Sequence, residues 1–377
     1  MKRILLLFLI VFLLVIPVSA EKAAEDEIID IVDDELSKFE SSLPDYVKDF
    51  LPNEVFDGDF SSIINNEIGQ SSFLEYTINY LLSFLPSTIK SFSNLLVLIL
   101  ISSIFNVMKE SFMSDGLKTA FSMCSTLCIS ISVFSIISTI LSRSIDFIGA
   151  LCGAMNSFAP VMSILYIISG SITSAAISNA SMMLFLSIIE NFIVYGLAPI
   201  VNICLCFSIV SSISCGTDLT GIAKSIKNMF TSICVFLVSI FSFVMSYQSV
   251  LSRSADSLSL RTARFAIGNF IPVVGGFVSD SIATISSSLG LIKSSCGTIA
   301  IIVILLLTIP IIISIWLNKI SFSLCSGISK ALSVDRDAQV FDEACTICSF
   351  ILAIVTLCSV IFIFALTIFI KSSVVIS

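Results

Sequence analysis

Residues 260–280 read LRTARFAIGNFIPVVGGFVSD and interrupt a series of long hydrophobic runs. The stretch opens with Arg261 and Arg264, which lie three residues apart and therefore on the same side of a helix. It then carries three positions that weaken a helix, namely Pro272, Gly275 and Gly276. Because proline lacks an N–H and glycine leaves the backbone loose, the stretch predicts a broken helical segment.

A break at membrane depth frees backbone groups that lipid cannot satisfy. Such segments occur where protein packs against them or where a water-filled cavity lies beside them. The alternative interpretation is a short hairpin at the membrane interface. The residues of the stretch that we take as candidates for a polar path are Arg261, Arg264, Gly268, Asn269, Pro272, Gly275, Gly276 and Asp280.

The composition assigns the chain to the integral membrane class. Hydrophobic residues make up 56% of the 377 residues, charged residues make up 12%, and the mean hydropathy is +1.07. An average soluble domain has about 25% charged residues. Several long apolar runs with so little charge between them therefore indicate a polytopic membrane protein.

The net charge of −8 is concentrated in one short segment. Residues 21–70 hold 15 acidic residues against three lysines. The rest of the chain shows no basic patch of the kind that binds nucleic acid. We therefore expect no nucleic-acid partner.

The sequence offers no recognisable catalytic or cofactor site. It contains no histidine, which removes His ligands and His-based triads, and its glycine pair lacks the Lys-Ser/Thr of a phosphate-binding loop. Its 12 cysteines are dispersed, and Cys345 and Cys348 form a lone CxxC without a second pair at zinc spacing. We expect a protein that is not an enzyme and that holds neither a metal nor a cofactor.

The N-terminal part predicts export. Residues 1–20 combine two basic residues, an apolar run and small residues before Ala20, which is typical of a signal peptide cleaved after that alanine. An uncleaved first span is the alternative. Residues 21–88 then form an acidic, extracytoplasmic region of amphipathic helices, and residues 89–377 form the membrane domain.

The membrane domain predicts an all-α bundle of about seven spans, give or take one, with broken or re-entrant segments. Arg143 and Asp146 are expected to mark a turn between two spans, and residues 319–343 to form the longest polar loop. Gly149 and Gly153 have the GxxxG spacing that permits close helix contact. The expected spans are residues 94–108, 119–141, 147–170, 175–213, 229–251, 298–317 and 344–370.

Residues 175–213 are long enough for one kinked span or two short ones. Glu190 lies within this apolar stretch, where an ionisable group is costly unless it faces the protein interior or water. It therefore faces a cavity in one interpretation and lies in a loop in the other. Because arginines favour the cytoplasmic side, Arg253, Arg261 and Arg264 favour a single broken crossing.

The run from Arg264 to Asp280, RFAIGNFIPVVGGFVSD, resembles the signature of the stage III sporulation protein AE family of endospore-forming bacteria. The overall layout of signal, acidic segment and multi-span domain is also similar to that family. The resemblance implies a permease-like subunit of the channel-like complex between mother cell and forespore. It implies a multi-pass protein of the mother-cell membrane, with the other subunits of that complex, a separate ATPase among them, as partners.

Two other functions fit the residues alone. A stand-alone secondary transporter would carry an inverted repeat, and the break at Pro160 matches the break at Pro272 only weakly. A non-conducting scaffold would use the motif for packing only. Substitution of Glu190, Arg261 or Asp280 separates these functions, because a path residue should alter permeation without altering assembly.

Overall fold

The computed structural model describes residues 70–112, 115–169, 171–213, 220–270 and 275–371. Residues 1–69, with the expected signal peptide and most of the acidic region, lie outside the described part. The elements are α4 (Gln70–Phe112), α5 (Asp115–Ile168), α6 (Ile172–Ile189), the π-helix η2 (Glu190–Val194), α7 (Tyr195–Ile213), α8 (Thr220–Phe270), α9 (Gly275–Ala331) and α10 (Asp335–Lys371).

The described chain is all-α and contains six stretches that are long and apolar enough to cross a membrane. This confirms the predicted fold class, since six falls within the expected seven give or take one. The six stretches are Ile78–Val107, Thr119–Ile168, Ile172–Ser212, Thr220–Ser259, Cys296–Ala331 and Asp335–Lys371.

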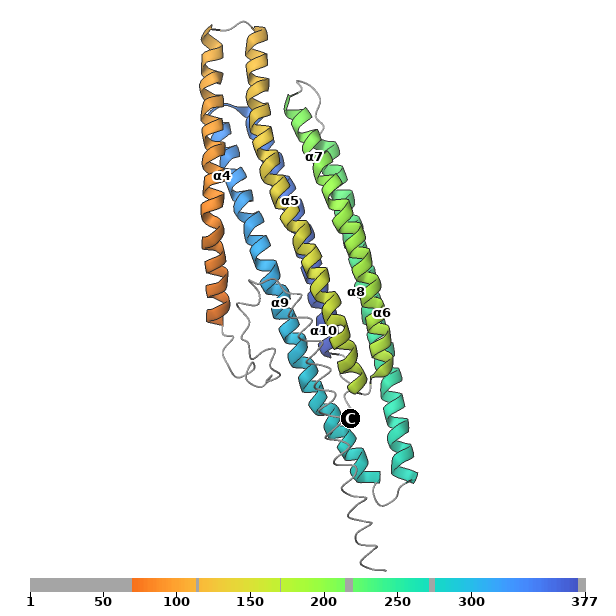
Figure 1. Ribbon diagram of the computed structural model, residues 1–377. Helices are drawn as coiled ribbons and strands as arrows, with labels where there is room; N and C mark the ends of the chain where they lie inside the picture. Colours follow the sequence, from red (N-terminus) through yellow and green to blue (C-terminus); the bar gives the residue numbers. More distant parts are fainter. Residues whose placement is uncertain (1–69, 113–114, 170, 214–219, 271–274, 372–377) are drawn as a thin grey trace, which may run out of the picture.

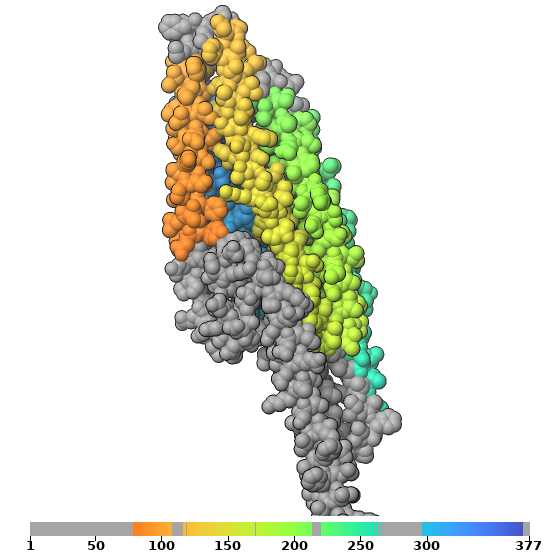
Figure 2. Space-filling model, viewed as in Figure 1, coloured from red at the N-terminus to blue at the C-terminus, as the bar shows by residue number. Residues whose placement is uncertain are grey.

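The helices pack in two layers of long, roughly parallel rods (Figure 1). One layer consists of α4, α5 and the continuous unit α6–η2–α7, and the other consists of α9, α10 and α8. Figure 2 shows the first layer from outside, with α5 in its middle. Because α5 has α4 on one side, α6 on the other and α10 behind it, the described helices leave only one of its faces open.

Neither the internal prolines nor the serine-rich runs break these helices. Prolines 86, 160, 199 and 310 lie inside helices, where packing against neighbouring helices compensates for the lost hydrogen bond. Many hydroxyls bond to the carbonyl four residues earlier, as Thr308 Oγ1 does to Ile304 O at 2.6 Å and Ser144 Oγ to Ile140 O at 2.8 Å. Serine-rich runs can therefore stay helical and apolar on their surface.

Contacts between helices fix which residues lie at the same level of the bundle. Thr126 of α5 bonds to Asp337 of α10, and Phe158 of α5 packs on Phe369 of α10, and both pairs are 211 positions apart. At that offset, the apolar residues 344–370 of α10 lie level with residues 133–159 of α5. Twenty-six helical steps span about 40 Å, which matches a bilayer with its headgroup regions.

Side-chain contacts also fix which residues of α8 and α10 lie at the same level. Lys227 pairs with Glu343 across 116 positions, and Arg253 bonds to Lys371 across 118 positions. Residues 227–253 of α8 therefore run beside 343–371 of α10 in the same direction. We call the slab between these two pairs the bilayer level. Its middle lies near Asp146 on α5.

One predicted turn is wrong, and one predicted loop is much shorter than expected. Arg143 and Asp146 lie inside the continuous helix α5, so the spans expected at 119–141 and 147–170 form one helix. The expected polar loop 319–343 consists of the end of α9, a short turn and the start of α10. Arg143 and Asp146 therefore project from an unbroken helix, whereas the charged residues of 319–343 lie on two helices that are joined by a turn at residues 332–334.

Residues 175–213 form one helical unit, neither a loop between two spans nor an unwound segment. The helix is continuous from Ile172 to Ile213 except that its hydrogen bonding widens to the π type over η2. Glu190 opens this π segment, so the interpretation that placed Glu190 in a loop is wrong. Single π-helical turns inside α-helices often accompany functional positions.

Candidate functional site

The candidate residues of the 260–280 stretch lie at the α8–α9 connection. Arg261, Arg264, Gly268 and Asn269 belong to the last turns of α8. Gly275, Gly276 and Asp280 belong to the first turns of α9. Pro272 lies outside the described residues. The two helix ends form a hairpin that extends beyond the end of the bundle where α5 meets α6 (Figure 1).

The structure describes the side chain of only one of these candidates. Arg261 is exposed, as is Phe265 one helical turn further along with 74% of its surface accessible. For the other candidates only the helical backbone is described. The stretch is therefore a helical hairpin in which α8 ends at Phe270 and α9 starts at Gly275.

Glu190 lies far from this hairpin. The antiparallel pairs Ser181–Gln248 and Thr173–Asp256 set the register of α6 on α8 and place Glu190 level with residues near 239 of α8. From there to Arg261 is about 33 Å along α8 at 1.5 Å per residue. The structure does not bring Glu190 together with the other candidates.

Glu190 instead shares its level with two charged residues of α5. Arg143 and Asp146 lie at the middle of the bilayer level, and η2 packs against α5. All three side chains are exposed. Within the described ranges, the side chains of Asp146 and Glu190 make no hydrogen bond or ion pair, and the Arg143 guanidinium lies 5.6 Å from the centre of the Phe84 ring. Ionisable groups at this depth are costly in lipid and indicate function.

A stripe of small and polar residues continues from these charges along the open face of α5. We call it the α5 stripe, and each of its members is exposed. Its members are Ser135, Thr139, Ser142, Asp146, Gly149, Gly153 and Asn156. A Cβ atom placed on Gly149 or Gly153 would meet nothing within 4 Å, so no part of the described chain covers this face. The stripe covers about 32 Å, close to the thickness of a hydrocarbon core.

The exposed face of α8 at the same level is of a different kind. It carries large apolar side chains, which suit contact with lipid tails: Ile233, Phe236, Ile240, Phe243 and Val250. The contrast shows that the α5 stripe is not a normal lipid-facing surface. Sequence reasoning missed it because a turn was expected at its centre, although the GxxxG spacing was a signal.

The interior also holds polar groups, but these are satisfied within the protein. Asp256 of α8 is 2% exposed and accepts hydrogen bonds from the backbone N–H groups of Thr173 and Ser174 at 3.0 and 3.1 Å. It also accepts one from Ser174 Oγ at 2.5 Å. The carboxylate thus caps the N-terminus of α6, where the helix dipole favours negative charge.

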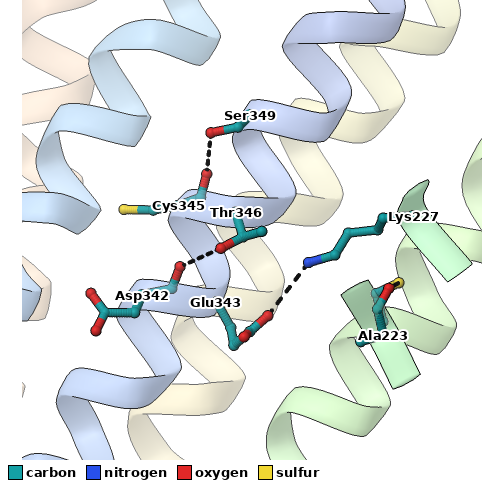
Figure 3. A network of polar contacts seen from close by, with 8 residues as sticks. Ala223, Lys227, Asp342, Glu343, Cys345, Thr346 and Ser349 are labelled. Atoms are coloured by element: carbon teal, nitrogen blue, oxygen red, sulfur yellow. Dashed lines mark hydrogen bonds and ion pairs between the residues drawn. The ribbon is translucent and has the colours of Figure 1, made fainter. Parts of the chain in front are cut away.

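The first turns of α10 connect three neighbouring helices. Asp337 is fully buried and accepts hydrogen bonds from Ser102 of α4 and from Thr126 of α5, the latter at 2.7 Å. Glu343 pairs with Lys227 of α8, which reaches across from the neighbouring helix in Figure 3. These contacts explain why acidic residues occur here without a loop.

The interior cavities lined by described residues are small. One, between α5, α6, α8 and α10, measures about 20 Å³ and is lined partly by Ser174, Ser178 and Gln248. A second, of about 20 Å³, lies beside Ser102 and Asn106. Each has room for about one water molecule. Among the described residues, no group of three or more Cys, Asp or Glu side chains is placed to hold a metal ion.

The continuous α5 changes the expected topology. Four described crossings, α4, α5, α6–η2–α7 and α8, lie between the start of α4 and the end of α8, in place of the five that the sequence predicted. The two points therefore lie on the same side. An extracytoplasmic N-terminal region and cytoplasmic Arg253 and Arg261 therefore cannot both be correct. The described basic residues at the opposite end are Lys224, Lys227, Lys319, Lys330 and Arg336.

In the described part of the chain, six long apolar helical stretches around an apolar core define a polytopic α-helical membrane protein. Residues 59–373 match the family model described as stage III sporulation protein AE. The chain belongs to this family. The match covers the α5 stripe, Glu190 and the whole 260–280 stretch.

A relative with the same description supports the assignment. The chain is 24% identical over 267 residues to the stage III sporulation protein AE of Bacillus subtilis (strain 168). The aligned region amounts to 70% of this chain and to 66% of that relative, just under two thirds of its length. No solved structure matches the chain.

Proposed function

We propose that the protein is a permease-like membrane subunit of the channel-like complex that connects mother cell and forespore during endospore formation. We further propose that its polar path runs along the outside of the α4–α5–α6/α7 layer, between this chain and a neighbouring subunit. Family membership supports the first statement. The α5 stripe and Glu190 support the second, since they place polar groups across the bilayer level on an open face.

The small cavities among the described residues favour a shared path over a private one. The cavities described above hold about one water molecule each, and the buried carboxylates Asp256 and Asp337 serve as contacts between helices. A stand-alone transporter needs a central binding site between its halves. A pure scaffold does not need unpaired charges at the middle of the bilayer level, which are costly in lipid.

The orientation follows from the same proposal. With the N-terminal region extracytoplasmic, the α9–α10 turn faces the mother-cell cytoplasm together with Lys224, Lys319 and Lys330. These lysines agree with the preference of basic residues for the cytoplasmic side, whereas Arg253 and Arg261 lie on the other side in this orientation. The hairpin at 260–280 then faces the forespore. The α9–α10 end is the side on which a separate ATPase would act.

The proposal is tested by thiol labelling in sporulating cells. In a functional background without native cysteines, Glu190→Cys is compared with Phe236→Cys, which lies at a similar level on the apolar face of α8. We expect a membrane-impermeant maleimide to label the first position and to leave the second unlabelled. Equal protection of both positions would overturn the proposed path.

A further inference from the structure

We infer that the α5 stripe is a self-association surface, through which α5 of one chain packs in parallel along α5 of a second copy. This deepens the proposed function, because it names the neighbour with which the chain shares its polar face. The evidence consists of the charges on the stripe, its spacing, its open glycines and its position in the bilayer level.

The charges favour a second copy over an unrelated helix. Asp146 lies on the stripe and Arg143 lies beside it, three residues earlier, so each chain offers one acid and one base at nearly the same level. In a parallel pair, Arg143 of each copy lies about one helical turn from Asp146 of the other. Two chains can therefore neutralise both charges with no other partner.

The spacing fits a pair of helices along the whole stripe. Its seven members alternate by four and three residues, which is a repeat of 3.5. This repeat keeps two helices in contact when they wind around each other in a left-handed pair with a crossing angle near 20°. A helix surface that only lines a water-filled path does not require polar residues at a 3.5-residue repeat.

The glycines permit a close approach. Gly149 and Gly153 lie one turn apart near the middle of the stripe, and a Cβ atom at either position would meet no described residue within 4 Å. The stripe from Ser135 to Asn156 lies level with residues 346–367 of α10, well inside the bilayer level. The backbones of the two copies would therefore be closest near the middle of the bilayer level, where contact of Asp146 with lipid costs the most free energy.

The first test adds bulk to the glycines. In the double variant Gly149→Leu, Gly153→Leu, the added side chains meet open space in a single chain but occupy the site of the second copy. The matched control is Gly327→Leu on α9, where a Cβ also meets nothing within 4 Å. Self-association of the purified full-length protein in lipid bilayers is measured by energy transfer between labelled copies. We expect the double variant to lose pairing at least about tenfold and the control to pair like the parent chain.

The second test exchanges the charges. Arg143→Asp alone and Asp146→Arg alone should each weaken pairing several-fold, since each leaves charges of only one sign at this level of the interface. The combined variant Arg143→Asp, Asp146→Arg should restore it. A merely structural role of either residue predicts additive losses and no restoration.

Three results would overturn the inference. The first is a parent chain that stays monomeric at all protein-to-lipid ratios. The second is a glycine variant that pairs as well as the control. The third is exclusive cross-linking of Gly153→Cys to a different polypeptide, which would assign the stripe to another subunit. None of these results depends on thiol labelling of Glu190→Cys, so failure of the pairing is distinguishable from failure of the proposed path.

Discussion

Lys227 of α8 and Glu343 of α10 form an ion pair in which Nζ lies 3.4 Å from Oε2 (Figure 3). The two side chains are only 5% and 18% exposed. Lys330 of α9 and Asp342 of α10 pair at 2.7 Å close by, but their side chains are 56% and 50% exposed. The two pairs therefore differ in burial while sharing the same turns of α10.

The buried pair should matter more for stability than the exposed one. Glu343→Gln leaves the Lys227 ammonium without its carboxylate in a nearly closed site, which we expect to cost about 2–4 kcal/mol. Asp342→Asn is the control and should cost about 1 kcal/mol or less, because water screens its pair. Thermal unfolding in detergent measures both. Equal losses of stability in the two variants would show that burial does not increase the contribution of the Lys227–Glu343 pair.

The Asp256 cap should hold the start of α6 against α8. Asp256→Ala removes the acceptor for two backbone N–H groups and one hydroxyl, with an expected loss of about 1–3 kcal/mol. Hydrogen exchange at Thr173 and Ser174 should become faster. Ser174→Ala removes only the hydroxyl donor and should have a smaller effect. Unchanged exchange at both amides in Asp256→Ala would refute the cap.

Gly297 should tolerate no side chain. A Cβ at this position would lie against Ile370 Cγ1 and 2.9 Å from Ile370 Cδ1. Gly297→Ala is therefore expected to destabilise the α9–α10 pair by about 1–3 kcal/mol. Adding Ile370→Ala should remove most of that loss, measured as a double-mutant cycle of unfolding free energies. Gly327→Ala, which meets open space, should stabilise the helix slightly.

Much of the fold is predictable from the sequence, because apolar runs of sufficient length have few alternatives in a membrane. The helix at 298–317, the helix at 344–370 and the all-α class follow from hydropathy alone. The connections are less predictable. Arg143 and Asp146 indicated a turn, since a charge in lipid is costly, but their cost depends on what covers α5, which the sequence does not encode locally.

The candidate site shows the same limit. Glu190 is identifiable as an ionisable residue in an apolar run, and the structure places it on an open face. That Glu190 lies at the same level of the bundle as Arg143 and Asp146 depends on the registers of α5 with α10 and of α6 with α8. Those registers come from side-chain contacts such as Thr126–Asp337 and Thr173–Asp256, between residues far apart in sequence.

The topology leads to a clear expectation for labelling. With α5 crossing once, Ser259→Cys on α8 and Ala331→Cys on α9 should react from opposite sides of the membrane. Ser259→Cys should react from the same side as a cysteine placed in the acidic N-terminal region. Labelling of Ser259→Cys and of the N-terminal cysteine from opposite sides would require an additional crossing between them and would contradict the continuous α5.

The most direct measurement is a disulfide cross-linking scan along α5. Single cysteines replace each residue from Ser135 to Asn156 in the cysteine-free, functional protein in native membranes, with Phe236→Cys and Ile240→Cys on α8 as controls. We expect self cross-links to peak at the seven positions of the α5 stripe, with a period of 3.5 residues, and to be absent at the controls. Cross-linking without that period, or at the α8 positions alone, would contradict the assignment of the open α5 face as the contact between copies.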